Sequence, residues 1–222
     1  MRFWCPSSTS AKYAVNFMRY EPDTREWIET YVTPGQHMWD VGANIGAYTL
    51  YASLAKGVTV TAFEPVAATY GALVTNVSLN PSAKDAAALA LALSDGNAIT
   101  PFYLRNTEAG GAMHALGAPE TFDGRFEAER VEHVVSIRGD ELVERFGARR
   151  PDHIKLDVDG HELRVLKGLS GILATVHTIW VETEEAAESS GENARIENYL
   201  SGFGFSAGQK GRNQVFVNKA RR

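Results

Sequence analysis

A carboxylate followed by a glycine-rich turn is the first place where the residue types indicate chemistry. The apolar run 37–41 contains Asp40 and leads into Gly42, Asn44 and Gly46, after which helix-forming residues resume. This order predicts a strand, a tight loop and the start of a helix. Open α/β sheets bind ligands at junctions of this kind, outside the carboxyl ends of their strands.

The residues of this junction narrow the class of ligand. A pyrophosphate-binding loop needs a glycine where Asn44 stands, because the backbone must approach the phosphates closely. Asp40 would repel phosphate but attract an ammonium group. A second strand, residues 58–63, ends at Glu64, about where a ribose-binding acid is expected. S-adenosylmethionine, a nucleoside with a cationic amino-acid part and no phosphate, fits both acids, whereas an ordinary strand-to-helix junction capped by Asp40 is the alternative.

A second centre lies at residues 154–162, where a buried strand is expected to deliver Asp157 and Asp159 to the same edge of the sheet. In an extended segment the two aspartates would point to opposite faces, whereas a turn would let them converge. Methyl transfer mainly requires alignment of the reactants, with a base where the acceptor holds its proton tightly. Asp157, Asp159 and His161 are the candidate bases, and His161 has the pKa nearest neutrality. A solvated histidine at a helix start is the other interpretation of His161.

The same acids raise the question of a metal. Asp157 and Asp159 after one strand, with Glu182 or Glu184 after the next, are hard oxygen ligands that suit Mg²⁺. Nothing in their spacing requires a metal. Mg²⁺ is therefore a cofactor that the sequence permits but does not favour, and no residue is assigned as a metal ligand.

Four separated motifs resemble the FkbM-type methyltransferases, a branch of the class I S-adenosylmethionine-dependent enzymes. They lie at residues 40–46, 62–65, 93–95 and 154–162, and the resemblance runs from about Trp39 to about Glu182. The resemblance implies O-methylation of hydroxyl groups on natural products or sugars. It also implies that the turn at Ser94 and Asp95 lies beside the adenine, and that the segment around Met113 approaches the acceptor.

The predicted site residues form three groups. Cofactor contacts are expected from Asp40, Gly42, Asn44, Gly46, Glu64, Pro65, Ser94, Asp95 and Asp157. Catalytic roles are expected from Asp157, Asp159 and His161, and acceptor contacts from Met113, His114 and Glu182. Two of these assignments have a purely structural alternative. His114 could belong to an ordinary loop, and Ser94 with Asp95 could form an ordinary turn.

The alternation of apolar segments with helical patterns predicts an α/β fold, a Rossmann-like class I methyltransferase domain. We expect a mostly parallel seven-stranded sheet with helices on both faces and a C-terminal antiparallel strand. Residues 87–93 are expected to form one buried strand, and residues 105–130 an irregular substrate loop. The single domain 1–222 would then consist of an N-terminal helical segment, 1–36, and a core, 37–222. The aromatic residues of segment 1–36 would either pack onto the sheet or cover the cofactor cleft.

The composition of the chain limits the kinds of binding partner and the cellular compartment that we expect. The chain has 222 residues and a formal net charge of -5, so it lacks the basic character expected of a nucleic-acid-binding protein. Cys5 is the single cysteine, and no run of about 18 apolar residues or signal-like segment is visible. We expect a cytoplasmic protein that acts on a small molecule and binds neither nucleic acid nor membrane; no pattern indicates an oligomeric state.

These observations predict an S-adenosylmethionine-dependent methyltransferase, with oxygen as the acceptor atom. N-methylation of a small amine is the alternative within the same class. Two alternatives lie outside the methyltransferase class: a nucleotide-binding oxidoreductase with the same sheet architecture, and a noncatalytic nucleoside-binding module.

Overall fold

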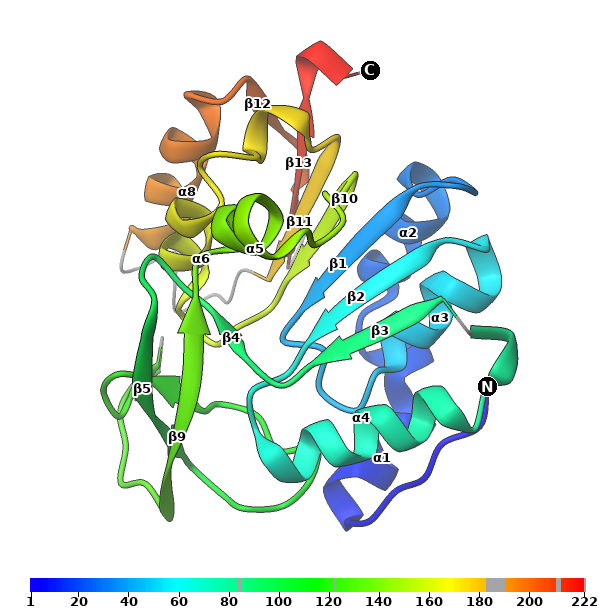
Figure 1. Cartoon of the computed structure of the whole chain (residues 1–222), viewed down its shortest axis with the longest axis vertical. Coiled ribbons are helices and arrows are strands. Elements are labelled where there is room, and N and C mark those ends of the chain that lie inside the picture. The colour runs from blue at the N-terminus through cyan, green and yellow to red at the C-terminus, as the bar shows by residue number, and fades with distance from the viewer. Residues whose placement is uncertain (84, 122, 183–190, 211–212, 222) are drawn as a thin grey trace.

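The computed structural model describes residues 1–83, 85–121, 123–182, 191–210 and 213–221, and a seven-stranded sheet runs through its centre (Figure 1). The strand order is β12-β13-β11-β10-β1-β2-β3. Five strands are parallel: β3 (Ala86–Leu89), β2 (Thr59–Phe63), β1 (His37–Val41), β10 (His153–Leu156) and β11 (Thr178–Glu182). β13 (Asn213–Asn218) pairs antiparallel with β11, and β12 (Phe205–Lys210) pairs antiparallel with β13. The predicted mostly parallel sheet with a C-terminal antiparallel strand is confirmed.

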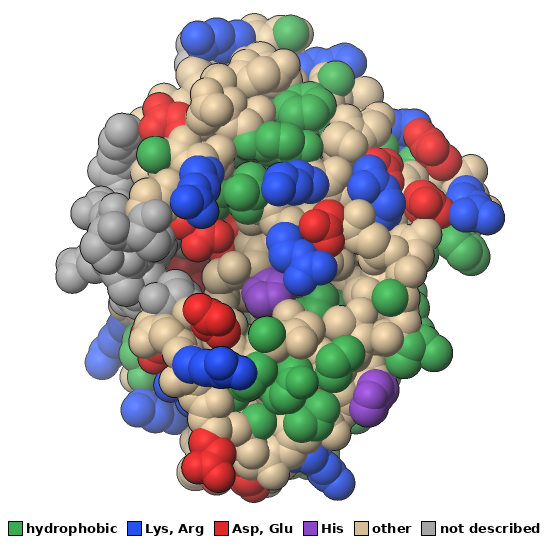
Figure 2. Space-filling view, turned by 90° about the vertical axis from the view of Figure 1, so that its left-hand side faces the viewer, with side chains coloured by type: hydrophobic (Ala, Val, Ile, Leu, Met, Phe, Trp, Pro, Cys, Tyr) green, Lys and Arg blue, Asp and Glu red, His purple; other side chains and the backbone are tan. Residues whose placement is uncertain are grey.

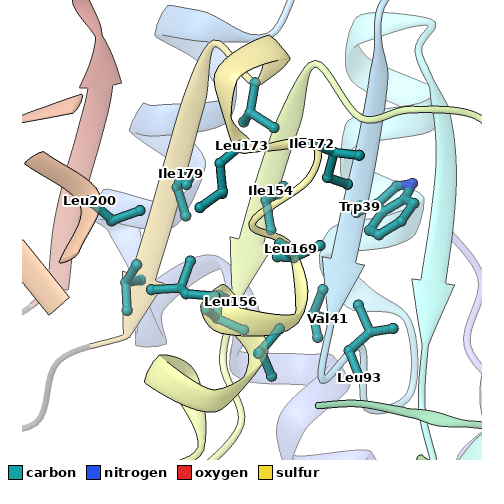
Figure 3. Close-up of a cluster of buried hydrophobic side chains, with 14 of the residues drawn as sticks. Trp39, Val41, Leu93, Ile154, Leu156, Leu169, Ile172, Leu173, Ile179 and Leu200 are labelled. Carbon is teal, nitrogen blue, oxygen red and sulfur yellow. The ribbon is translucent and has the colours of Figure 1, made fainter. Parts of the chain in front are cut away.

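Helices cover both faces of this sheet because its central strands carry apolar side chains on both sides. One face packs against α5 (Gly139–Phe146), α6 (Glu162–Gly168) and α8 (Glu192–Ser201). Figure 3 shows the cluster that joins them, in which Trp39, Ile154 and Ile179 of the strands meet Leu169 and Leu200. The other face packs against α1 (Ser8–Tyr20), α2 (Pro22–Tyr31), α3 (Ala47–Lys56) and α4 (Ala67–Ser78). Single 3-10 turns lie at Pro81–Ala83, Leu173–Thr175 and Lys219–Arg221.

The N-terminal segment packs onto the sheet through its aromatic residues, as one of the two expectations had it. Phe17 and Trp27 belong to the same buried cluster as Met38 and Trp180 of the strands. The Trp27 indole Nε1 donates a hydrogen bond of 2.9 Å to Thr178 Oγ1 on β11. α2 begins with a proline in its first turn, a position where the missing N–H costs nothing.

A second sheet, which the sequence did not predict, lies beside the first. Its order is β4 (Ala92–Leu93), β9 (Arg130–Ile137), β5 (Ala98–Leu104) and β6 (Ala115–Leu116), and a small hairpin joins β7 (Glu120–Thr121) to β8 (Gly124–Arg125). The prediction of one buried strand over residues 87–93 was wrong. Residues 86–89 form the half-buried edge strand of the main sheet, whereas residues 92–93 pair with β9 in the second sheet.

Two further findings bear on the predicted partners. None of the helices within the described residues is long and apolar enough to cross a membrane. On the face shown in Figure 2, lysine and arginine side chains are interspersed with aspartate and glutamate side chains instead of gathering into one basic surface.

Buried histidines tie together the amino ends of the parallel strands. Gln36 Oε1 can only accept, so His153 Nε2 donates to it at 2.9 Å, and Nδ1 of the neutral ring accepts from the Thr178 hydroxyl at 2.8 Å. His37 lies on the neighbouring strand and is also buried. Burial lowers the pKa of both His37 and His153 to about 4, so both rings are neutral at physiological pH.

The free energy of unfolding should therefore fall as the pH drops from 6.5 towards 4. The unfolded chain protonates His37 and His153 near pH 6.5, but the folded chain protonates them only near pH 4. Protons thus favour the unfolded chain in this window, by about 2 kcal/mol per histidine at pH 5. Urea unfolding at pH 7 and pH 5 measures the loss. The His37→Gln/His153→Gln double variant should lose less stability over the same interval, and an equal loss in both proteins would contradict this account.

Candidate functional site

A cavity of about 240 Å³ opens at the carboxyl ends of the parallel strands. Its wall includes Val41 and Phe63, which end β1 and β2, and Gly42 and Glu64, which directly follow them. Asp157 after β10 and Glu182 at the end of β11 complete this part of the wall. Leu91, Leu93, Phe102 and Leu116 add an apolar side from the segments that lead into and form the second sheet. Most of the predicted site residues thus meet in one cavity, although they are far apart in the sequence.

The glycine-rich turn leaves no room for a side chain at Gly42. Its φ is +80°, and a Cβ added there would lie 1.8 Å from the Asp157 carbonyl oxygen. Backbone hydrogen bonds hold the same contact, because Gly42 N donates to Phe63 O at 3.1 Å and Asp157 N donates to Val41 O at 3.1 Å. The two sequence signatures are therefore in direct backbone contact.

Asp40 and Gly46 lie behind the wall and do not line the cavity. Asp40 is 1% exposed, and its Oδ2 accepts from Thr49 Oγ1 at 2.5 Å. Burial raises its pKa, while the neighbouring Lys155 acts in the opposite direction. Gly46 begins α3, where a Cβ would lie 2.5 Å from Leu73. In this structure α3 seals the Asp40 carboxylate inside the protein, away from the cavity, and direct contact of Asp40 with a ligand stays a prediction.

Glu64 does line the cavity, as do Asn44 and Pro65. One Glu64 oxygen accepts from Asn44 N at 3.0 Å, and the other accepts from Val66 N at 2.9 Å. Burial raises the pKa of Glu64 to about 7, against the opposing effect of these two donors. A carboxylate has lone pairs beyond these two bonds, so Glu64 can still accept hydrogen bonds from a ligand.

The turn at Ser94 and Asp95 does not reach the wall, whereas the preceding Leu93 does. Ser94 is 2% exposed, and its carbonyl oxygen lies so close to α6 that a Cβ on Gly168 would approach it to 1.9 Å. Asp95 Oδ1 accepts from Arg164 Nε at 3.0 Å and Nη2 at 2.9 Å. Packing of α6 thus directs this turn away from the cavity that it was expected to line.

Asp157 and Asp159 both line the cavity, so the converging alternative holds for them. β10 ends at Leu156, and Asp159 has a left-handed φ of +53° that turns the chain. Asp159 Oδ2 accepts from Met113 N at 2.7 Å, and Asp157 Oδ2 accepts from Lys155 Nζ at 2.5 Å. One aspartate therefore holds the neighbouring loop, and the other is paired with a buried lysine.

His161 stands at the start of α6 with a defined tautomer. Its Nε2 lies 2.6 Å from the Leu116 carbonyl oxygen, which can only accept, so Nε2 carries the proton. Nδ1 is then a lone pair, and it has no hydrogen-bond partner among the described residues. Burial lowers the His161 pKa, which favours the neutral ring. His161 lines the cavity as a neutral ring, and its Nδ1 atom is itself buried in this structure.

Residues 105–114 form a loop that is tied across the cavity. Asn44 Nδ2 donates to the carbonyl oxygens of Gly110 and Gly111 at 3.3 and 3.2 Å. His114 Nδ1 accepts from Arg105 N at 3.1 Å, and burial lowers the His114 pKa to about 4. His114 therefore supports the loop as a neutral ring and has its Nδ1 lone pair occupied, which disfavours it as a base.

Backbone strain gathers on this wall. Among the described residues, the non-glycine positions with positive φ are Asn44 (+51°), Met113 (+63°) and Asp159 (+53°), and all three line the cavity. Left-handed backbone is unfavourable for residues with a Cβ and tends to persist at functional sites. The three positions are held in place by the Glu64, Gly110 and Asp159 hydrogen bonds described above.

Tyr13 lines the cavity, as the second expectation for the aromatic residues of segment 1–36 allowed, whereas sequence reasoning gave no sign of Glu21. Glu21 comes from the junction between α1 and α2, and no spacing rule connects it to the strand ends. Its carboxylate gathers with those of Asp157 and Glu182, with one oxygen of each lying within 4.8 Å of the others. We call these three residues the acid trio. The predicted alternative Glu184 lies outside the described residues.

The three carboxyl groups of the acid trio affect one another's protonation. The charge of Asp157 raises the pKa of Glu182, and burial raises the pKa of Glu21. Lys155, 1% exposed, contacts Asp157 and lies about 5 Å from the rings of Tyr48 and Trp180. With its pKa raised to about 11, the Glu182 carboxyl is protonated at neutral pH, so the acids of the trio are not all charged at once.

Comparison with known proteins places these features in a family. The Methyltransferase FkbM domain family matches residues 40–207, which include both signatures. The chain belongs to the FkbM methyltransferase family. The resemblance found in the sequence is thereby confirmed.

One relative by sequence and two solved structures define the similarity further. Hexuronic acid methyltransferase AglP of Haloferax volcanii is 32% identical over 147 residues, which cover 65% of this chain and 54% of AglP. The crystal structure of methyltransferase FkbM from Methylobacillus flagellatus superposes with a TM-score of 0.58 at 16% identity, covering 96% of this chain and 56% of that one. Magnesium protoporphyrin IX methyltransferase from Synechocystis, solved with bound S-adenosylmethionine, gives a TM-score of 0.57 at 11% identity, with coverages of 96% and 85%.

This FkbM-family chain therefore has the class I methyltransferase fold. It spans only about half the length of AglP and of the Methylobacillus chain.

Gly42→Ala should destabilise the protein far more than Gly57→Ala. Both glycines have positive φ (+80° and +64°), so both alanines carry a left-handed backbone cost of about 1 kcal/mol. Only at Gly42 would the new Cβ meet another atom, the Asp157 carbonyl oxygen, whereas nothing lies within 4 Å at Gly57. Urea unfolding should show losses of about 1 kcal/mol for Gly57→Ala and about 3 kcal/mol or more for Gly42→Ala. Equal losses would mean that the two signatures separate easily.

Asn44→Gly should loosen the loop across the cavity. Glycine keeps the left-handed backbone of residue 44 but removes the amide that donates to Gly110 and Gly111. Hydrogen–deuterium exchange of amides 106–113 should become about tenfold faster, whereas Asn16→Ala, which removes an amide from α1 outside the cavity, should leave it unchanged. Unaltered exchange in Asn44→Gly would show that other contacts hold the loop.

Proposed function

We propose that the chain binds S-adenosylmethionine in this cavity and methylates a hydroxyl group of a small molecule, a natural product or a sugar. The observation that carries the proposal is the junction of Gly42 and Asn44 with Glu64 on one wall, in a chain of the FkbM methyltransferase family. The bound S-adenosylmethionine of the Synechocystis enzyme, which shares the fold, supports the choice of cofactor.

The residues of the wall fit the parts of this cofactor. Glu64 is anchored by Asn44 N and Val66 N and can accept hydrogen bonds from ribose hydroxyls. The apolar side chains of Leu91 and Leu93 offer a surface for a flat adenine ring. When bound, S-adenosylmethionine would supply a methyl group activated by its attachment to a positively charged sulfur.

The protein's own part is to place the acceptor and to take its proton. We assign the proton-accepting role to His161, because it lines the cavity, the Leu116 carbonyl fixes its Nε2–H, and its Nδ1 lone pair has no hydrogen-bond partner among the described residues. Asp159 positions the acceptor side indirectly, because it holds Met113 and with it the loop over the cavity.

The acidity of the cavity supports oxygen over nitrogen as the acceptor atom. Glu21, Asp157, Asp159 and Glu182 all line it. Such surroundings raise the pKa of a bound amine and keep it as an ammonium ion, which has no lone pair for attack. A hydroxyl group is neutral and can donate its proton to a carboxylate or to His161. The family match gives no support to the oxidoreductase alternative.

The first test is isothermal titration with S-adenosylhomocysteine and with NADH. We expect saturable binding of S-adenosylhomocysteine and no heat from NADH, and about tenfold weaker binding in Glu64→Ala, which loses both the ribose acceptor and the anchor of Asn44. Wild-type protein and Glu64→Ala are then incubated with S-adenosylmethionine and hydroxylated metabolites, and products 14 mass units heavier are sought. A protein that binds NADH but not S-adenosylhomocysteine would refute the proposal, and binding without any transfer would favour a noncatalytic module.

A further inference from the structure

We propose that the outward side of the second sheet binds a second copy of this chain and that the protein forms a two-fold symmetric dimer. Alternate residues of β5 and β9 make up this surface, which we call the outer β5–β9 face. Its members are Ile99, Pro101, Tyr103, Val131, His133 and Val135. The inference concerns a surface outside the cavity and does not depend on which ligand the cavity binds.

The register of the two strands brings these six side chains together. The cross-strand pairs are Ile99 with Val135, Pro101 with His133 and Tyr103 with Val131. Successive side chains of a strand point to opposite faces, and residues directly opposite each other in an antiparallel pair share a face. The six side chains therefore form one continuous surface, three cross-strand pairs long.

The outer β5–β9 face is apolar and yet open to solvent. Ile99 is 76% exposed, Val135 52% and Val131 45%. An antiparallel sheet with one side on the core normally presents polar side chains on its other side. Figure 2 shows hydrophobic side chains gathered on the lower part of the molecule, where β5 and β9 lie in Figure 1. A contiguous exposed apolar surface is typical of an interaction site.

The preference of strands for β-branched residues does not explain this face. On the inner side of the same strands, the hydroxyl groups of Thr100 and Ser136 lie 2.7 Å apart in a hydrogen bond. The polar residues thus point inwards at this end of the strands, whereas their neighbours Ile99 and Val135 point to solvent. Threonine has a similar strand preference and would suit a solvated face better. The apolar choice favours contact with another surface.

The lack of charge on the face selects its occupant. None of its six residues carries a carboxylate, an ammonium or a guanidinium group. In a two-fold contact the same surface meets itself, so any net charge on it would be repeated and would repel. The chain has a formal net charge of -5, which opposes the approach of two copies. An uncharged apolar face is a place where two copies can meet without that repulsion.

Charged side chains that flank the face in the sequence are paired within the chain. Arg130, which begins β9, lies 3.9 Å from Glu132, and Arg105, which follows β5, lies 3.0 Å from Asp123. These pairs leave no border of one sign that would attract a strongly acidic or basic partner. A second copy supplies a neutral apolar surface of the same size and twist, and two such sheets pack face to face about 10 Å apart.

The inner side of the same sheet reaches the cavity. Phe102 of β5 pairs with Leu116 of β6, and both side chains line the cavity wall. A second copy on the outer side would therefore cover the back of this apolar wall and restrict its motion.

The first test is sedimentation equilibrium of the whole chain from about 1 µM to about 300 µM, the range in which small interfaces associate. We expect a dimer with a Kd of about 10 µM, because the face is small. The variant Ile99→Thr/Val135→Thr should dimerise about 30-fold more weakly, because a two-fold contact contains each substitution twice. Val15→Thr is the matched control at a 79% exposed valine of α1, and its Kd should stay within about twofold of wild type.

A pair of opposite charges tests whether the partner is the chain itself. Val135→Lys and Val135→Glu should each be monomeric, because the two-fold axis brings like charges together. An equal mixture of the two variants should associate, because opposite charges then face each other. Association of the mixture also shows that both variants are folded.

Four outcomes would overturn the inference. Wild-type protein that is monomeric at every concentration has no such dimer. A dimer with the same Kd in Ile99→Thr/Val135→Thr forms through another surface. A mixture of Val135→Lys and Val135→Glu that stays monomeric, beside a dimeric wild type, excludes a two-fold contact at this face. A monomer that co-sediments with phosphatidylcholine vesicles, and no longer does so in Ile99→Thr/Val135→Thr, would assign the face to a lipid surface.

Discussion

The contact between Gly42 and the Asp157 carbonyl is the constraint on which the rest of the site depends. Three neighbouring strands end at this point, and backbone hydrogen bonds from Gly42 to Phe63 and from Asp157 to Val41 hold those ends together. Because no side chain fits between the two loops, the glycine-rich turn and the second signature behave as one rigid wall. Glu64 and Asp159 then extend the wall, because their carboxylates accept hydrogen bonds from the backbone N–H groups of Asn44 and Met113.

Charged groups behind and on this wall are a second feature that positions the site residues. Lys155 is buried between the rings of Tyr48 and Trp180 and contacts Asp157, although a buried ion pair is generally a poor source of stability. The contacts of Lys155 indicate an electrostatic role. It holds Asp157 in one orientation and offsets part of the repulsion among the acids above it. The cavity floor is thus strongly polar, whereas the side formed by Leu91, Leu93 and Leu116 is apolar, and the two ends suit different parts of one amphipathic ligand.

The sequence predicted those parts of the site that depend on local pattern. Strand ends, the turn at Gly42 and the positions of Glu64 and Asp157 follow from hydrophobic runs and glycine spacing, and the structure has them there. Tertiary packing decided the rest. Asp40 is hidden by α3, the turn at Asp95 is drawn away by Arg164, and Glu21 arrives from a helix junction with no sequence signal that links it to the sheet. The second sheet was missed because β5 and β9 pair across an irregular segment, and such long-range pairing leaves no local period to read.

The left-handed residues on the cavity wall have a consequence for how this protein can change. Asn44, Met113 and Asp159 each hold an unfavourable backbone conformation that glycine would adopt freely. Glycine at these positions would relax the chain but remove the side chain, or the rigidity, that shapes the wall. At these three residues, a substitution that relieves backbone strain would therefore also alter the shape of the cavity. Variants selected for heat resistance alone would tend to lose the shape of the cavity. Selection for both heat resistance and ligand binding would preserve that shape.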